Sequence, residues 1–377
     1  MNRAALRRRL VLPLALAVAP VAALLGAMGG TASADTTPAP RLSLPAPTGP
    51  YRVGTTTAEL PGASDRPELM AQLWYPTKAT QGRDASYFPP KTTLLAARTF
   101  HVPVKFIARI DTHALVDATP VDGAHPVVLF SPGENGLRSD STSLELELAS
   151  RGFVVVGFDV PGESALVEYP NGQVIPGTWK DTGDRSRAQA VQTRVTDLRA
   201  GLHGLSVIDN TRLLRNRLDL TRIGMFGFSL GGATTADALR ALPQIRAGVD
   251  LDGSLYGSAL TTPLRRPFML LARNSHSTKT DPSWQSAWSQ LHDFHREIRI
   301  VGAGHESFSD NATFINALNL EDHYPPAEIG TIPPDRATTA VGQLLTAFFD
   351  RYLNSGHTDS AILDTPHQLN ANLVRIG

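Results

Sequence analysis

The stretch Gly227-Phe228-Ser229-Leu230-Gly231 places a serine between two glycines, an arrangement suited to nucleophilic chemistry. The G-x-S-x-G pattern is typical of a sharp strand-to-helix turn that exposes the serine hydroxyl, because glycines remove the side chains that would clash there. An apolar run over 223–226 precedes the serine, and a helix-like run over 233–242 follows it. A glycine-rich helix entry without chemistry is the simpler alternative, but the strand–turn–helix order favours Ser229 as a nucleophile.

A serine nucleophile needs a base that takes its proton, and histidine commonly has this role. Four histidines follow the last predicted core strand, at 298–301, and His305 lies just past its end. That position is at the edge of the sheet where Ser229 emerges, and Gly304 leaves room for the ring to turn toward the serine. We therefore predict that His305 is the general base. The other three histidines do not share this position: His323, His357 and His367.

The base in turn needs an acid that fixes its tautomer, and two aspartates are candidates. Asp252 ends a predicted strand at 247–251, whereas Asp281 follows the next predicted strand, at 267–271, which is the commoner place for the acid. Asp250 shares a face with Asp252 at period two, so it is a candidate for a hydrogen-bonded support. Both assignments of the acid remain open from the residues alone.

An oxyanion formed during acyl transfer needs two backbone N–H donors. The first is predicted to be the N–H of Leu230, which directly follows the nucleophile. The second is expected from the turn 131–136, after the predicted strand 127–130, and the N–H of Glu134 is the candidate. A carboxylate beside a developing oxyanion would be unfavourable, so we expect the Glu134 side chain to point away.

The elements that must position these residues alternate between short apolar strands and helices. This order predicts an α/β fold with a mainly parallel central sheet and helices on both faces. Antiparallel strands are expected over 51–75, a long loop over 159–184, and no single period is visible over 84–121. The remaining predicted elements are a strand at 153–158 and helices at 139–151, 185–209, 284–294 and 341–353.

The first 34 residues are typical of a secretory signal peptide: a basic start, an apolar run over 10–28, and a cleavage site at Ala32-Ser33-Ala34. Pro13 and Pro20 interrupt the apolar run, which argues against a membrane anchor. The adjacent N-terminal arginines permit a twin-arginine export route. Residues 35–50 are expected to form a flexible Pro-rich leader, and 51–377 a single domain.

Composition excludes several classes of function. The chain has no cysteine, so it uses neither disulfides nor a thiol, and its 35 basic and 35 acidic residues argue against a nucleic-acid partner. His292 and His295 are three apart on the predicted helix 284–294, but no third ligand has zinc-like spacing and no H-E-x-x-H motif occurs. No phosphate-binding or dinucleotide fingerprint is present either. We expect no metal and no cofactor.

Several stretches give the chain a family resemblance. It resembles the plasma-type platelet-activating-factor acetylhydrolases and their secreted bacterial lipase relatives. The resemblance implies an α/β-hydrolase fold and cofactor-free, calcium-independent hydrolysis of short or oxidised acyl chains from phospholipids. It also implies that Asp252 is the acid, because this family places its acid one strand earlier than most. The matching stretches are 73–76, 126–133, 149–155, 227–232, 249–252 and 304–305.

The chain departs from that family in two ways. Its oxyanion turn has Pro132-Gly133 where the family has a His-Gly pair, with acidic Glu134 where an apolar residue is usual. Residues 84–121 and the C-terminal part match poorly.

We therefore expect a secreted serine esterase or lipase that acts on short-to-medium acyl esters. The alternatives are a polyester or cutin-type hydrolase, a peptidase, and a non-catalytic hydrolase fold that only binds. Residues 84–121 are expected either to form an acyl-binding wall or transient lipid-interface contact, or only to pack against the sheet edge. The loop 159–184 is expected to overhang the site and shape substrate selection.

Overall fold

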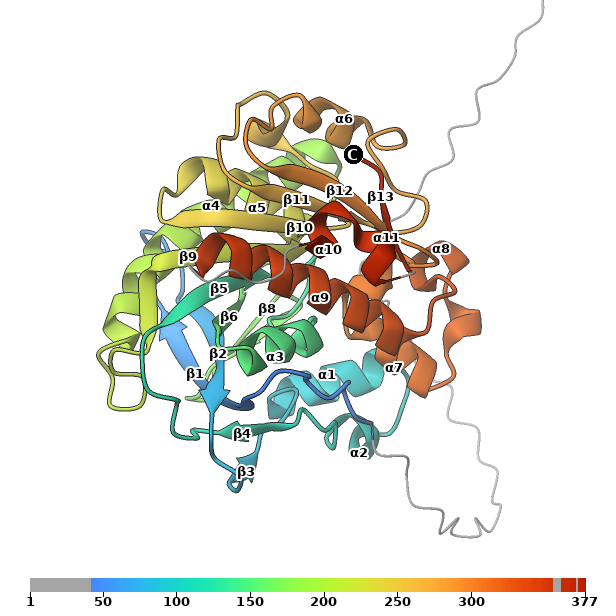
Figure 1. Ribbon diagram of the computed structural model, residues 1–377. Helices are drawn as coiled ribbons and strands as arrows, with labels where there is room; N and C mark the ends of the chain where they lie inside the picture. The colour runs from blue at the N-terminus through green and yellow to red at the C-terminus, as the bar shows by residue number, and fades with distance from the viewer. Residues whose placement is uncertain (1–41, 355–360, 371) are drawn as a thin grey trace, which may run out of the picture. The chain divides into compact units, whose positions relative to one another are not determined.

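Strands from the whole length of the chain join into one twisted sheet in this computed structural model (Figure 1). The structure describes residues 42–354, 361–370 and 372–377, which belong to one compact unit. The sheet has eleven strands in these residues, in the order β13-β12-β11-β10-β9-β5-β6-β2-β1-β4-β3. Their bounds are β1 Arg52–Leu60, β2 Leu69–Thr77, β3 Arg83–Asp84, β4 Ala114–Val116, β5 His125–Ser131, β6 Val154–Asp159, β9 Leu218–Phe228, β10 Ile245–Leu251, β11 Phe268–Ala272, β12 His295–Ile300 and β13 Leu373–Arg375.

The centre of the sheet, from β6 through β5, β9, β10 and β11 to β12, is parallel throughout. Two of these strands, β6 and β11, are short apolar runs with every residue buried, because helices cover both faces of the sheet. The antiparallel pairs β1–β2, β2–β6 and β12–β13 extend the sheet on both sides. The predicted mainly parallel sheet is therefore confirmed.

Two layers of helices enclose this sheet (Figure 1). Helices α3 and α9 cover one face, where Phe130, Phe226 and Phe349 pack together, and α4 and α5 cover the other, where Val191 and Leu239 are buried. The longer helices are α1 Pro90–Thr99, α3 Thr142–Ser150, α4 Asp184–Ile208, α5 Leu230–Ala241, α6 Pro282–Trp288, α7 Asn311–Ala317 and α9 Pro334–Leu353. The short ones are α2 Val104–Ile107, α8 Pro326–Ile329, α10 Ala361–Asp364, α11 Pro366–Leu369, η1 Gly257–Leu260, η2 His305–Phe308 and η3 Glu321–His323.

Two segments without a clear sequence period are structured. The predicted loop 159–184 contains an antiparallel hairpin of β7 (Leu166–Glu168) and β8 (Val174–Pro176). Residues 84–121 contain α1, α2 and β4. The two segments are joined, because the Glu168 carboxylate accepts hydrogen bonds from the backbone N–H groups of Lys91 and Thr92 at the start of α1.

Two predictions are wrong in the structure. The expected helix 284–294 ends at Trp288, and His295 begins β12, so His292 and His295 do not share a helix face. The helix stops because residues 291–292 turn back to pair with Leu264.

Residues 42–50, expected to belong to a flexible leader, pack on the domain instead. Leu42 and Leu44 are buried, and the Leu44 N–H donates to the backbone carbonyl oxygen of Asp111 at 3.0 Å. The expected signal peptide and residues 35–41 lie outside the described residues.

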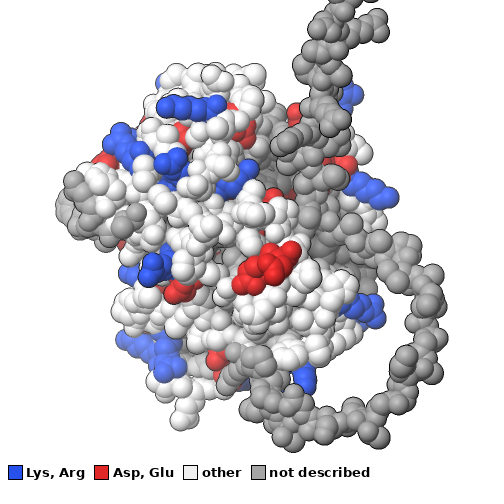
Figure 2. All heavy atoms as spheres, turned by 90° about the vertical axis from the view of Figure 1, so that its right-hand side faces the viewer, with Lys and Arg blue, Asp and Glu red and all other residues white. Residues whose placement is uncertain are grey.

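Charged side chains do not gather in one large area on the face drawn in Figure 2. Its described part is mostly uncharged, with small, separate groups of basic and acidic side chains. Among the described helices, none combines the length and the apolar composition needed to cross a membrane.

Candidate active site

Ser229 lies on the tight turn that joins β9 to α5, as its flanking glycines predict. Its φ of 54° and ψ of −119° are unusual for a residue with a side chain, and such strain is common at functional sites. The glycines are required by close packing: a Cβ atom at Gly227 would lie 2.0 Å from the Gly231 oxygen, and one at Gly231 1.9 Å from the Ser131 oxygen. The Ser229 hydroxyl makes no hydrogen bond to another residue in the described part of the chain, and its side chain is partly exposed.

The turn after β5 lies against this serine. A Cβ atom on Gly133 would be 3.4 Å from the Cβ of Ser229. The backbone N–H groups of Leu230 and Glu134 have no hydrogen-bond partner among the described residues. Both predicted oxyanion donors are thus available in the backbone that surrounds Ser229.

A buried arginine fixes the orientation of that turn. Arg194, on α4, is 1% exposed and donates to the carbonyl oxygens of Pro132 and, at 2.8 Å, of Gly133, while it pairs with Glu163. In a trans peptide the C=O and the following N–H point in opposite directions. Because the Gly133 carbonyl points to Arg194, the Glu134 N–H points away from Arg194. Arg194 was not predicted from the sequence, because it is not part of a recognisable motif.

The Glu134 side chain lies beside Arg187. Its Oε2 atom is 4.0 Å from the Arg187 Nε atom, and its Oε1 atom is buried without a partner in the described residues. Burial raises the pKa of Glu134, and the negative charge of Asp181 raises it further. A raised pKa lowers the negative charge that this side chain carries close to the oxyanion turn.

Asp252 and His305, predicted from distant parts of the sequence, are in direct contact. Asp252 follows β10 with a φ of 60°, and its Oδ2 atom lies 2.6 Å from the Nδ1 atom of His305, at the start of η2. The His305 ring also packs on Phe228, next to the serine, with ring centroids 4.7 Å apart. His305 is therefore located over the end of β9, where Ser229 emerges.

The contact changes the acidity of both groups. Burial alone would raise the pKa of Asp252, but hydrogen bonds from His276 and His305 outweigh it and hold the pKa well below its usual range. Burial alone would lower the pKa of His305, but the hydrogen bond and the charge of Asp252 raise it above its usual value. Asp252 is thus ionised at neutral pH, and it favours the protonated form of His305.

A second histidine, missed from the sequence, contacts the same carboxylate. The His276 Nδ1 atom lies 2.7 Å from Asp252 Oδ1, and its Nε2 atom lies 2.9 Å from Asp281 Oδ2. Its ring stacks on the buried Trp284, with centroids 4.0 Å apart. The base was expected beyond the last core strand, and His276 precedes that strand. Its position between the two candidate acids was the available signal.

The two other candidate aspartates have different partners. Asp281 contacts His276 and caps α6, where its Oδ1 atom accepts from the Ser283 N–H at 2.7 Å. Asp250 is fully buried, and its Oδ1 atom accepts from the Gly253 N–H at 2.9 Å. Of the three aspartates, Asp252 is the one in contact with His305.

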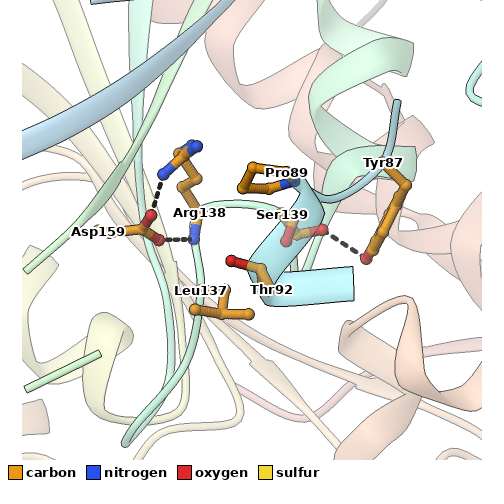
Figure 3. A pocket seen from close by; sticks show the side chains of 7 residues that line it. All are labelled: Tyr87, Pro89, Thr92, Leu137, Arg138, Ser139 and Asp159. Atoms are coloured by element: carbon orange, nitrogen blue, oxygen red, sulfur yellow. Dashed lines mark hydrogen bonds and ion pairs between the residues drawn. The ribbon is translucent and has the colours of Figure 1, made fainter. Parts of the chain in front are cut away.

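A small pocket lies beside the segment that continues from the oxyanion turn (Figure 3). It is closed on one side by Arg138, which pairs with Asp159, and on the other by Tyr87, whose hydroxyl donates to the Ser139 oxygen at 2.6 Å. Pro89 and Thr92, at the start of α1, complete it with Leu137. Part of the segment 84–121 therefore lines a pocket with the residues that follow the oxyanion turn. In the described residues, no cluster of three or more His, Asp or Glu side chains is arranged to hold a metal ion.

A parallel sheet with a serine on a strained strand-to-helix turn defines the α/β-hydrolase fold. The sequence profile described as "Platelet-activating factor acetylhydrolase, isoform II" matches residues 37–176 and 184–362, and the chain belongs to this family. The predicted resemblance is thereby confirmed.

Three similar proteins support an ester hydrolase. A "Probable 1-alkyl-2-acetylglycerophosphocholine esterase" of Arthroderma benhamiae is 26% identical over 347 residues, 81% of this chain and 87% of the relative. The structure of a ferulic acid esterase from Streptomyces cinnamoneus superposes with a TM-score of 0.78 at 28% identity, over 90% of this chain and 100% of the other. Cutinase est2 of Thermobifida alba is 25% identical over 130 residues, 34% of this chain and 35% of the relative. The chain is a carboxylic ester hydrolase.

Proposed function

We propose that this chain hydrolyses carboxylic esters through an acyl-enzyme on Ser229, with His305 as general base and Asp252 as its acid. The observation that carries the proposal is the 2.6 Å contact between Asp252 and His305. That contact holds the imidazole against Phe228, beside the strained serine turn. Nucleophile, base and acid thus come from the ends of three different strands, β9, β12 and β10, at one edge of the sheet.

In the first half of the reaction, the Ser229 oxygen attacks the carbonyl carbon of the ester while the Nε2 atom of His305 takes the serine proton. The negative charge that forms on the carbonyl oxygen is stabilised by the N–H groups of Leu230 and Glu134. The tetrahedral intermediate then expels the alcohol, which receives the proton from His305. In the second half, water attacks the carbonyl carbon of the acyl-serine while His305 removes a water proton. The bond from that carbon to the Ser229 oxygen then breaks, the serine oxygen takes the proton from His305, and the carboxylic acid leaves.

Short acyl esters of phospholipids are the substrate class that we propose first. The family match and the Arthroderma benhamiae relative, whose name specifies an acetyl-glycerophosphocholine ester, support it. A polyester or cutin-type substrate is the second candidate, supported by the cutinase likeness over residues that make up 34% of this chain.

A hydrolysis panel on the purified chain separates these candidates. It compares p-nitrophenyl esters of rising acyl length, a phospholipid with a short sn-2 acyl chain, a triglyceride emulsion and a soluble polyester. Preference for the phospholipid supports the first candidate, and preference for the polyester supports the second. A fluorophosphonate probe tests the mechanism, since folded protein that is not labelled would exclude a serine enzyme and favour a binding protein.

We propose that α1, α2 and the hairpin β7–β8 select the acyl group or the lipid surface. Their support is location: Glu168 of the hairpin caps α1, and Pro89 lines a pocket together with residues 137–139, which follow the oxyanion turn. Leu94 and Val104, on these helices, are 46% and 41% exposed, which suits transient contact with lipid. Replacing both with Ser should lower activity on vesicles and leave the hydrolysis of a soluble ester unchanged. An equal loss on both substrates would contradict this role.

We also propose that the protein is exported, on the evidence of the basic start, the apolar run and the cleavage site of its first 34 residues. Expression of the full sequence in a secreting host should release protein that begins at Asp35. N-terminal sequencing of protein from the medium measures this. Protein retained with an intact Met1 would indicate that the segment is not cleaved.

A further inference from the structure

The two oxygens of the Asp252 carboxylate face two different histidines. Oδ2 lies 2.6 Å from His305, the proposed base, and Oδ1 lies 2.7 Å from His276. His276 continues to a second carboxylate, Asp281, at 2.9 Å. His305, Asp252, His276 and Asp281 therefore form a hydrogen-bonded series, of which the proposed mechanism uses the first two.

The geometry determines the protonation of His276. An ionised carboxylate only accepts hydrogen bonds, so a histidine with each ring nitrogen on a carboxylate satisfies both contacts only when both nitrogens carry a proton. The ring is 5% exposed, so water does not readily replace either partner. Burial alone would lower the pKa of His276, but the hydrogen bonds to Asp252 and Asp281 outweigh it and raise the pKa to about 9.

The surroundings of His276 hold its ring in one place. Trp284 stacks on the ring, and its indole N–H is fixed on the Gly253 oxygen, one residue after Asp252. Asp281 is held as well, because its Oδ1 atom caps α6 and the Ser254 hydroxyl donates to its Oδ2 atom at 2.6 Å. The contact from His276 to Asp252 is thus made by a rigid group, which suits an orienting role.

We propose that His276, doubly protonated between Asp252 and Asp281, is a positioning residue for ester hydrolysis, an inference that rests on the proposed function. Together with Arg273, whose backbone N–H donates to Oδ1 at 2.9 Å and whose guanidinium pairs with Oδ2, it fixes the rotation of the Asp252 carboxylate so that Oδ2 faces His305. Its positive charge would by itself weaken the stabilisation of protonated His305 by Asp252. The negative charge of Asp281 neutralises it, so that the charge of Asp252 remains available to His305.

This role predicts an alkaline limit to activity. The charged and titratable groups that face His276 are Asp252, Asp281, Arg273 and the buried Asp250, and the other packed ring, Trp284, does not titrate. The folded pKa of His276 is raised, so its contribution to stability is complete at low pH and is lost as pH rises through about 9. Above that pH one of its two hydrogen bonds is lost and Asp252 is less firmly oriented.

The test compares the variants His276→Gln and Asp281→Asn with wild type. It measures kcat and KM on a soluble p-nitrophenyl ester from pH 6 to 10, and the melting temperature of each protein. For His276→Gln we expect kcat to fall on the order of 10²-fold, with KM nearly unchanged, because misplacement of a catalytic group lowers turnover. Asp281→Asn keeps the helix cap but removes the charge, so its alkaline limit should shift to lower pH. His125→Gln, a partly buried histidine bonded to the Gly152 oxygen, is the matched control and should behave as wild type.

Proton NMR gives a readout that does not depend on activity. Two downfield imidazole N–H signals from one ring should be present at neutral pH and absent in His276→Gln. Unchanged kcat and pH profile in both variants, with or without a lower melting temperature, would overturn the positioning role. If His276→Gln does not fold, the shift of the alkaline limit of activity in Asp281→Asn tests the positioning role by itself. An inactive, unlabelled wild type would instead refute the proposed function, so the two failures are distinguishable.

Discussion

The candidate site has two halves that are built in different ways. The nucleophile half, around Ser229, is made by one continuous stretch in which β9 ends and α5 begins. The acid half, around Asp252, is made by side chains that follow three strands, β10, β11 and β12, and meet only in the folded chain. The first half depends on backbone geometry that glycines permit, whereas the second depends on hydrogen bonds between buried charged groups.

This difference predicts how a substitution affects each half. A turn held by backbone packing tolerates a change of the serine side chain without rearrangement, so such a variant reports chemistry alone. In the buried cluster, the removal of one charge leaves another without a partner, so variants there change both chemistry and stability. The same kind of substitution therefore measures different quantities in the two halves.

The largest effect is expected in the nucleophile half. Ser229→Ala removes the attacking oxygen and should lower kcat by about a million-fold, and His305→Ala should do nearly the same, since the two act as a unit. Kinetics on a p-nitrophenyl ester, with the melting temperature as control, measures this. If the double variant has the same kcat as either single variant, Ser229 and His305 act as a unit. If its loss of kcat equals the product of the two single losses, they act independently.

In the acid half, Asp252→Asn should lower kcat by about 10⁴-fold, because an amide no longer fixes the tautomer and charge of His305. Asn is among the residues that adopt positive φ more readily, so the backbone at φ 60° is kept. Asp281→Asn at neutral pH should cost far less, because Asp281 contacts His276 and not the base. The reverse order of the two effects in the same assay would assign the acid to Asp281.

The sequence was sufficient for the strand-to-helix turn at Ser229 and for the parallel centre of the sheet, because both are local patterns. The glycines around Ser229 and the apolar runs 153–158 and 267–271 each determine the nearby backbone. His276, in the acid half, could not be predicted in this way, since no spacing relates it to Asp252. The helix expected over 284–294 was wrong for a similar reason, because pairing with Leu264 ends it.

Arg194 tests whether the nucleophile half also depends on a distant side chain. Arg194→Met leaves the Pro132 and Gly133 carbonyls without their donor and should lower kcat on the order of 10²–10³-fold, the loss typical of one oxyanion donor. It also leaves Glu163 buried and unpaired, so the double variant Arg194→Met, Glu163→Gln separates the two effects. If the double variant regains both stability and turnover, the orienting role of Arg194 is refuted.

Asp250 gives the smallest expected effect and the sharpest contrast, because it lies two residues before Asp252 on the same strand end. Burial raises the pKa of Asp250 well above its usual value, and its Oδ2 atom has no partner in the described residues. A raised pKa favours the uncharged form of this carboxyl, and an amide has nearly the same shape. Asp250→Asn should keep the hydrogen bond that Oδ1 accepts from the Gly253 N–H, and the substitution should change kcat by less than about tenfold, since the hydrogen-bond partner of Asp250 is Gly253 and not His305. Kinetics of Asp250→Asn and Asp252→Asn side by side measure the difference between them, which is expected to be at least about 10³-fold. Equal losses would mean that the whole strand end, and not the single carboxylate in contact with His305, determines the activity of the acid half.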